Sequence, residues 1–338
     1  MAATLKDVAE LAGVSIKTVS NVVNGYEFVR AETRERVQVA IATTGYRPNL
    51  GARNLRKGRT GFIALAVPEL DNPYFAELAS LVITAADRHD WTVLIEQTHG
   101  IRDRELAVVT SARSQRIDAA ILSPLAVGPD DLRRAARDTP LVLLGERPAA
   151  GRAGRPAIDH VAVDNVAAAR TAVEHLISLG RRRIAAIGDQ PGQDAGTASL
   201  RMTGYREAMR KASLPVDPAL VVQAADYSRA EGAAAMNQLL NLHEPPDAVF
   251  CFNDLLAMGA LRTAGVRGLE VPRELAVIGF DDIREGAYGV PALTTIAPDK
   301  KAIADTAVDL AFGAQARAGK PMAQDITAPF ELRVRETA

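Results

Sequence analysis

Apolar runs of six or seven residues alternate with longer amphipathic segments along most of the chain, from about residue 61 onward. The runs have the length of buried strands, and the intervening segments space their apolar residues as helices do. This alternation is typical of parallel, doubly wound α/β sheets, and more than 270 residues of it predict two lobes. Strands are expected at 61–67, 91–97, 118–123, 140–145, 183–188, 247–252 and 275–280, and helices at 75–89, 166–179, 199–212 and 255–264.

Composition restricts the class of protein further. Apolar residues make up 48% of the chain and aromatic residues only 4%, so Ala, Val, Leu and Ile must fill a large core. A single cysteine, Cys251, excludes an internal disulfide framework and suits a reducing compartment. No apolar run approaches the roughly 18 residues that a membrane span needs, and the charged N-terminus does not resemble a signal peptide. We therefore expect a cytoplasmic protein.

Charge is unevenly distributed. Residues 1–60 contain ten Lys/Arg and five Asp/Glu, a net charge of +5, which leaves −6 for the remainder of the chain. A basic head on an acidic body suggests that the head contacts a polyanion, although a solvated basic face would have the same composition.

The head has the spacing of a helix-turn-helix. Thr4 begins a first helix with Asp7 three residues later, as in a capping box, and Ser15 begins a second helix. Between them Gly13 allows the positive φ of a tight turn, while Ala9 and Val19 supply the small and aliphatic contacts of the motif. A third helix is expected at about 32–43, ending at Gly45. A generic three-helix bundle remains an alternative. In the helix-turn-helix interpretation four residues point outward, toward base edges in a major groove: Ile16, Lys17, Ser20 and Asn21.

Two blocks make the prediction specific. TLKDVAELAGVSIKTVSNVVNG (residues 4–25) resembles the DNA-binding headpiece of the LacI/GalR family of bacterial regulators, and GYRPNLGARNLRKGRT (residues 45–60) is similar to that family's hinge segment. The resemblance implies that Ile16, Lys17 and Asn21 read bases. It also implies phosphate contacts by Thr4, Ser15, Thr18, Ser20 and Asn24, and a hinge helix that carries Arg53 and Leu55.

The hinge resemblance has a consequence for the DNA target. Leu55 matches a leucine that wedges into the minor groove, and such a wedge unstacks a base step and kinks the duplex at a cost of a few kcal/mol. One wedge from each subunit of a homodimer implies a palindromic operator kinked at its centre. Ile16 offers no hydrogen bond and can only pack on apolar groups such as a thymine methyl, so the operator sequence cannot be copied from a relative.

Polar residues follow three of the predicted strands. DNPYF (71–75) comes after the first strand, Asn253 and Asp254 follow another, and Asp281 and Asp282 follow the last. Ligands of doubly wound sheets bind beyond the carboxyl ends of the strands, where such groups would converge on hydroxyls. Asn253, Asp254 and Asp282 could equally be helix caps.

The body also resembles the effector domain of the same family, through NPYF, residues 163–188, SLRMTGYREAM, FNDLLAMGAL, VIGFDDI and PALTTI. The resemblance implies an all-α helix-turn-helix headpiece (1–47), a hinge helix and linker (48–60), and an α/β two-lobed domain like periplasmic sugar-binding proteins (61–338), with the chain crossing between lobes three times. It implies an effector site formed by Tyr74, Phe75, Thr197, Arg201, Tyr227, Asn253 and Asp281, with Glu146 as a variable polar contact.

Catalytic signatures are missing from the sequence. It contains no G-x-S-x-G, H-E-x-x-H or intact Walker motif, and its five histidines lack ligand spacing. We therefore expect no catalytic residue, cofactor or metal, and we do not expect an enzyme.

The sequence as a whole predicts a homodimeric repressor of transcription whose DNA binding is switched by a small molecule, with a sugar favoured over a purine or nucleoside. A transport-type sugar receptor without DNA function, or an enzyme of the same fold, are the alternatives. No leucine heptads near the C-terminus support a tetramer.

Overall fold

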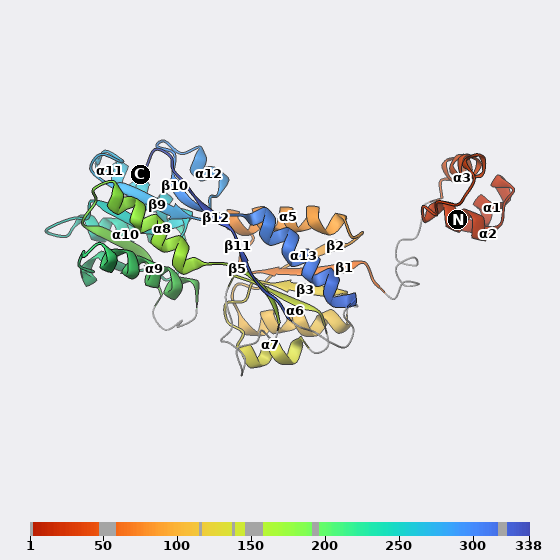
Figure 1. Cartoon of the computed structure of the whole chain (residues 1–338), viewed down its shortest axis with the longest axis horizontal. Helices are drawn as coiled ribbons and strands as arrows, with labels where there is room; N and C mark the ends of the chain where they lie inside the picture. The colour runs from red at the N-terminus through yellow and green to blue at the C-terminus, as the bar shows by residue number, and fades with distance from the viewer. Residues whose placement is uncertain are drawn as a thin grey trace. The chain divides into compact units, whose positions relative to one another are not determined.

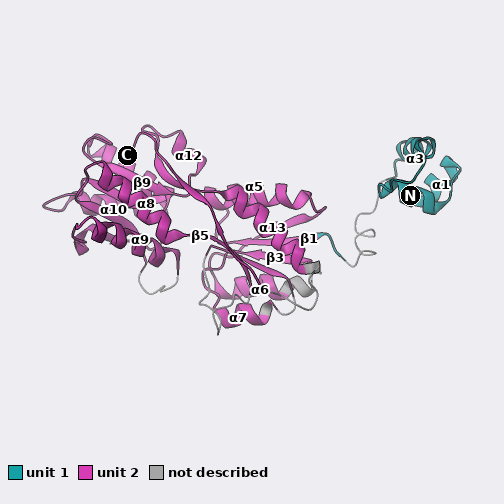
Figure 2. Ribbon diagram, in the orientation of Figure 1, with its two compact units in different colours: residues 1–61 teal, residues 62–338 magenta. Residues whose placement is uncertain are grey.

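The structure of the chain is a computed structural model, and it describes residues 3–46, 59–114, 117–136, 139–145, 158–190, 196–316 and 323–338. It divides into two units, residues 1–61 and 62–338, coloured separately in Figure 2. Three predicted site residues, Arg53, Leu55 and Glu146, lie outside the described residues.

Residues 3–46, the main described part of the first unit, form the helices α1 (Leu5–Ala12), α2 (Ile16–Val23) and α3 (Ala31–Thr44). The expected capping box is present: the Asp7 amide donates to the Thr4 hydroxyl, and the Thr4 amide donates to the Asp7 carboxylate. Gly13 ends α1 at φ 62°, a conformation that costs glycine little, and Ser15 caps α2. The helices share a core of buried aliphatic residues from all three: Val8, Ala9, Ala12, Val19, Val22, Val37 and Ala40.

The second unit begins with a lobe built on a parallel sheet, which we call lobe 1. Its strand order is β11-β5-β4-β3-β1-β2. Helices α5 and α13 cover one face of the sheet, and α6 and α7 cover the other (Figure 1). The strands are β1 (Phe62–Val67), β2 (Thr92–Gln97), β3 (Ala119–Leu122), β4 (Leu141–Leu144), β5 (Asp159–Val163) and β11 (Asp325–Ala328), and the helices α5 (Pro73–Asp87), α6 (Arg102–Ser114), α7 (Pro129–Ala135) and α13 (Lys300–Ala316).

Lobe 2 repeats this plan with strand order β12-β10-β9-β8-β6-β7, in which only the β10–β12 pair is antiparallel among the described pairs. Its strands are β6 (Ile184–Asp189), β7 (Val221–Gln223), β8 (Ala248–Cys251), β9 (Ala276–Phe280), β10 (Thr294–Pro298) and β12 (Phe330–Arg333). Its helices are α8 (Asn165–Ser178), α9 (Thr197–Lys211), α10 (Arg229–Leu240), α11 (Asp254–Val266), α12 (Arg284–Ala287) and a 3-10 turn at Pro218–Leu220.

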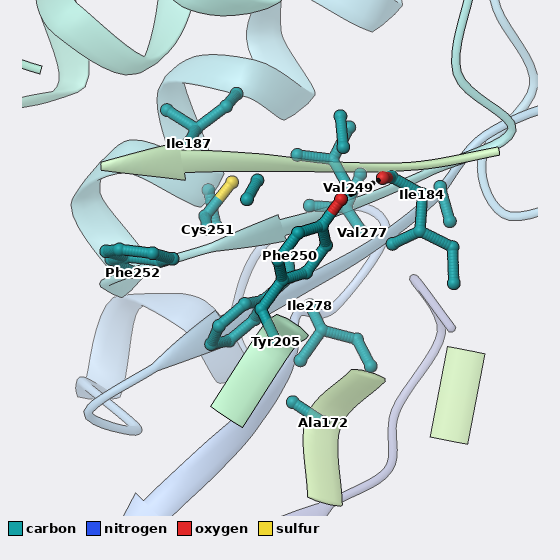
Figure 3. Close-up of a cluster of buried hydrophobic side chains, with 14 of the residues drawn as sticks. Ala172, Ile184, Ile187, Tyr205, Val249, Phe250, Cys251, Phe252, Val277 and Ile278 are labelled. Atoms are coloured by element: carbon teal, nitrogen blue, oxygen red, sulfur yellow. Dashed lines mark hydrogen bonds between the residues drawn. The ribbon is translucent and has the colours of Figure 1, made fainter. Parts of the chain in front are cut away.

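Aliphatic and aromatic side chains from strands and helices meet in the core of lobe 2 (Figure 3). Tyr205 of α9 is fully buried there, and its hydroxyl donates to the Ile184 carbonyl oxygen at 2.8 Å, which satisfies the one polar group that it brings inside. Cys251 is also buried, and burial raises the pKa of its thiol. This cysteine is therefore a packing residue, with an unreactive thiol.

The chain passes between the lobes three times, as the resemblance implies. It goes from β5 to α8, from β10 to α13, and from β11 to β12 (Figure 1). The predicted fold class is confirmed, and each of the seven predicted strands and four predicted helices has a counterpart within two residues at either end. The sequence pattern did not predict β5, β7, β10, β11 or β12. Within the described ranges, no helix is both long and apolar enough to traverse a lipid bilayer.

Candidate functional site

The outward side of α2 carries the predicted base-reading residues. Ile16 is 50% exposed, Lys17 is exposed, and Ser20 and Asn21 are half-buried, whereas Val19 is fully buried beneath them. The helical period thus separates a core face from a face of one aliphatic, one cationic and two polar side chains. The exposed side of α2 therefore carries the kinds of side chain that contact base edges in a major groove.

The predicted phosphate contacts surround this helix and have local partners as well. Ser15 Oγ accepts from the Thr18 amide at 3.1 Å, and Asn24 Nδ2 donates to the Ser20 carbonyl oxygen at 2.7 Å. Thr4 Oγ1 donates to Asp7 Oδ2 at 2.9 Å. The hydrogen bonds that Asp7 accepts from the Thr4 amide and hydroxyl lower the pKa of its carboxyl group. These bonds fix the ends of α1 and α2, so the hydroxyl groups are held in place without a ligand.

A cavity of about 530 Å³ lies within the second unit, where the carboxyl ends of strands from both lobes meet. Lobe 1 contributes residues that follow β1, β3 and β4, and lobe 2 contributes residues that follow β6, β7, β8 and β9. Seven of the eight predicted effector residues line this one cavity: Tyr74, Phe75, Thr197, Arg201, Tyr227, Asn253 and Asp281. The sequence therefore predicted a set of residues that the fold brings together.

Arg201 of α9 is the central cation of the cavity, although it is only 7% exposed. Its Nε donates to Asn165 Oδ1 at 2.9 Å, and its Nη1 donates to the Phe252 carbonyl oxygen. The guanidinium carbon lies 3.5 Å from the centre of the Phe280 ring. Fixed on three sides in this way, the guanidinium keeps its remaining N–H groups oriented with little loss of entropy on binding.

Asp281 faces Arg201 from the end of β9, with Oδ1 at 3.8 Å from Nη2. Burial raises the pKa of the carboxyl group to about 6, while Arg201 and Lys300 oppose that shift. The ion pair is too long for a strong direct hydrogen bond, so both groups retain hydrogen-bonding capacity for a third partner. A carboxylate and a guanidinium side by side can together bind adjacent hydroxyl groups.

Aromatic rings form the walls around this polar centre. Tyr74 and Phe75 lie in the first turn of α5 and meet edge to face with ring centroids 5.2 Å apart. Burial raises the pKa of the Tyr74 hydroxyl. On the lobe 2 side the Tyr227 hydroxyl donates to the Gly188 carbonyl oxygen at 3.0 Å, which leaves the ring to line the cavity. Such rings can stack on the apolar face of a sugar or on a base.

The sequence left open whether Asn253, Asp254 and Asp282 are helix caps, and in the structure only Asn253 is one. Asn253 caps α11, because its Oδ1 accepts from the Leu256 amide at 2.9 Å, and it also lines the cavity. Asp254 is fully buried and accepts from the Thr295 hydroxyl and the Ile283 amide. Asp282 pairs with Arg335 at 2.6 Å and does not cap α12.

Several cavity residues were not predicted from the sequence. Asn165 and Phe280 orient Arg201, and His99 and Gln190 add polar groups to the lining. Asn165 directly follows Asp164 at the junction of β5 and α8, so its position after a strand could have marked it, had β5 been recognised. Among the described residues, no three His, Cys, Asp or Glu side chains are grouped as a metal site would require.

Comparison with known proteins then identifies the family. Residues 4–49 match the model of "bacterial regulatory proteins, lacI family", and residues 173–338 match the "periplasmic binding protein-like domain". The HTH-type transcriptional repressor PurR of Erwinia tasmaniensis is 35% identical over 312 residues, which are 91% of this chain and 89% of that protein. The chain belongs to the LacI family.

Solved structures of transcriptional regulators agree with this assignment. A LacI-family transcriptional regulator from Sanguibacter keddieii is 44% identical and superposes with a TM-score of 0.75 over 83% of this chain and 99% of that one. A complex of the transcriptional regulator CelR with cellobiose is 30% identical, with a TM-score of 0.72 over 99% and 100% of the two chains. The matched proteins are DNA-binding regulators of transcription, and as a LacI-family member this chain is one too.

Proposed function

We propose that this LacI-family regulator represses transcription as a homodimer on a palindromic operator, and that a small molecule in the cavity between the lobes changes its operator affinity. One observation carries the proposal: seven side chains expected to bind an effector converge on one cavity in a chain that begins with a helix-turn-helix. We further propose the division into a headpiece (1–47), a hinge (48–60) and an effector domain (61–338). Its DNA target would place the protein in the bacterial cytoplasm.

DNA recognition is assigned to the exposed side of α2. Lys17 supplies a cation for base edges or phosphates, Asn21 supplies an amide suited to adenine, and Ile16 supplies an apolar contact for a thymine methyl. Thr4, Ser15, Thr18, Ser20 and Asn24 would contact phosphates, which orient the protein without reading sequence. The hinge residues Arg53 and Leu55 would act in the minor groove, with Leu55 as the wedge.

A sugar is the proposed effector. Arg201 and Asp281 can bind neighbouring hydroxyls while Tyr74, Phe75 and Tyr227 cover the less polar faces of the ring. The cellobiose in the CelR structure supports a sugar, since CelR aligns with 99% of this chain. A purine or nucleoside is the competing ligand class, and it would use the same polar groups with more stacking. Glu146 is assigned a variable polar contact.

Dimerisation is supported by exposed apolar residues on lobe 1. Strand β2 lies at the edge of its sheet, and Leu94 and Ile95 on it are each 37% exposed. Ile83 of α5 and Ile101 are 41% and 46% exposed. A second copy of the chain is the proposed occupant, because two identical half-sites of a palindrome require two identical headpieces.

The switch follows from differential binding. Because the cavity has walls from both lobes, a ligand that contacts both favours one relative arrangement of them. That arrangement would in turn favour or disfavour the paired hinge helices, and operator affinity would shift by the ligand's differential affinity for the two states. No bond of the ligand needs to be broken, so the proposal includes no enzymatic step.

Two experiments test the proposal. Fluorescence anisotropy with duplexes from the gene's own promoter should give specific binding that weakens steeply with salt, because each neutralised phosphate releases counterions. Lys17→Ala should weaken that binding, whereas Lys211→Ala, which changes an exposed lysine of lobe 2, should not.

A thermal-shift screen of sugars and nucleosides should identify the effector, since a ligand at 100 times its Kd stabilises the folded protein by about 2.7 kcal/mol. Absence of DNA binding at low ionic strength, with and without each hit, would refute the proposal.

A further inference from the structure

A buried ion pair connects the two lobes beside the cavity. Lys300 is the first residue of α13 in lobe 1, and its Nζ lies 2.6 Å from Glu77 Oε2 of α5 in the same lobe. The same ammonium group donates to the carbonyl oxygens of Asp281 and Asp282, at 2.9 and 2.8 Å, at the end of β9 in lobe 2. One side chain thus bridges from lobe 1 to two consecutive peptide groups of lobe 2.

Glu77 makes a second connection of the same kind. Its other carboxylate oxygen, Oε1, accepts from the backbone amide of Arg284, the first residue of α12 in lobe 2, at 3.0 Å. The Glu77 and Lys300 side chains are only 15% and 12% exposed. Each charge is therefore largely removed from water, and neither can lose its partner without a large penalty.

The position of Lys300 is unfavourable for a lysine by local rules. A cation in the first turn of a helix faces the positive end of the helix dipole. Lys300 nevertheless occupies this position, directly after the β10–α13 crossing. Its contacts with Glu77 and with the two carbonyl oxygens offset this cost. The contacts with the two carbonyl oxygens join different lobes, so they exist only while the lobes hold their present arrangement.

The lobe 2 segment that the pair holds is also the one that carries an effector residue. Asp281 and Asp282 have φ angles of 111° and 49°, in a region that residues with a side chain rarely adopt. Asp254 holds the next residue, with its carboxylate accepting from the Ile283 amide at 2.8 Å. The direction of the Asp281 carboxylate therefore depends on a strained turn, and Lys300 stabilises that turn from the opposite lobe.

We propose that Glu77 and Lys300 are a latch between the lobes, which positions Asp281 for the effector and couples its contacts to lobe closure. Neither residue needs to touch the effector. Lys300 Nζ lies 6.0 Å from the Tyr74 ring centroid, so the latch is directly behind the cavity wall. The inference rests on the proposed function only where it treats Asp281 as an effector contact.

Inter-lobe distances in the full-length protein test the latch without DNA or effector. The single native cysteine, Cys251, is buried, so spin labels can be attached selectively to the variant Arg104→Cys, Ala230→Cys, whose exposed positions lie on α6 of lobe 1 and α10 of lobe 2. Electron–electron distance measurements on labelled chains diluted with unlabelled chains report distances within one protomer.

In Lys300→Met and in Glu77→Gln, the ratio of molecules at the wild-type inter-lobe distance to molecules at other distances should fall by about fivefold or more. Lys300→Arg, which keeps the donors, should retain most of that population. Lys301→Met is the matched control: Lys301 is 72% exposed and pairs with Asp305 on its own helix, so the distribution should not change.

The proposal is overturned if both Lys300→Met and Glu77→Gln keep the wild-type distribution of inter-lobe distances. It is also overturned if Lys301→Met changes that distribution as much as they do. Should Lys300→Met fail to fold, Glu77→Gln, which keeps the side-chain shape, decides alone. Failure of both to fold would also overturn the proposal, because a latch between lobes leaves each lobe intact when it opens. Loss of operator binding by the wild-type protein would count against the proposed function and not against the latch.

Discussion

Arg201→Ala removes the cation at the centre of the cavity, and its consequences can be estimated from the contacts. The substitution removes the N–H groups that donate to Asn165 Oδ1 and to the Phe252 carbonyl oxygen. Both acceptor oxygens then lose this hydrogen bond. Leaving such groups unpaired costs about 1–3 kcal/mol each. Without the guanidinium, the pKa of Asp281 rises further, so a larger fraction of this carboxyl group is protonated near neutral pH. Protonation limits the loss of stability but removes an ionised acceptor from the site.

Effector affinity and stability should therefore both fall, whereas operator affinity should not. Loss of charge-assisted hydrogen bonds, at about 1.5–3 kcal/mol each, predicts a Kd that rises by about 100-fold or more. A loss of about 3 kcal/mol of stability would lower Tm by about 6–12 °C in a unit of this size. Operator affinity without effector should stay within about threefold, because the headpiece belongs to a different compact unit.

Titration calorimetry with the effector, thermal unfolding and operator anisotropy measure these three quantities. The matched control is Arg206→Ala, which removes an exposed arginine from the same helix, α9, and should leave effector affinity unchanged. The reasoning is wrong if Arg201→Ala binds effector within about threefold of wild type, or if Arg206→Ala weakens binding equally.

Three further predictions address the rest of the chain. Effector affinity should fall about tenfold between pH 8 and pH 5, since Asp281 has a raised pKa of about 6 and loses its charge as the pH falls through that value; Asp281→Asn should abolish this pH dependence in calorimetry, and a flat wild-type profile would contradict the assignment. Gly259→Ala should destabilise lobe 2 by about 3 kcal/mol in chemical unfolding, because its Cβ would lie 2.1 Å from the Arg229 carbonyl oxygen, whereas Gly265→Ala meets nothing within 4 Å and should cost nothing. Leu55→Ala should weaken operator binding in anisotropy and leave effector binding intact, and equal loss of both would indicate misfolding.

Much of the fold was predictable because local signals agree with the global arrangement. The buried strands of parallel sheets are continuous apolar runs, and all seven such runs became strands. The strands that escaped prediction are short or lie near sheet edges. For example, β12 (Phe330–Arg333) alternates polar with apolar residues, and β7 has only three residues. Their pairing depends on neighbours that are distant in sequence, which periodicity cannot reveal.

The candidate site was predictable to the extent that it follows strand ends. Asp281 and Asn253 directly follow apolar runs, and both line the cavity. Lys300 and Glu77 carry no such signal, because their importance arises from a contact between segments more than 200 residues apart. Leu11 shows that apolar spacing alone does not determine burial: it follows Val8 by three residues in α1, yet Leu11 is 56% exposed while Val8 is fully buried. Tertiary packing determines both the Lys300–Glu77 contact and the exposure of Leu11.

Operator affinity measured across an effector titration tests the central claim most directly. Anisotropy of a labelled palindromic duplex, read with the purified full-length protein at fixed ionic strength, should give an operator Kd that changes by about tenfold or more between zero and saturating effector. The predicted change should vanish in Arg201→Ala. An operator Kd that stays constant while calorimetry shows the effector bound would contradict the claim that the cavity controls DNA binding.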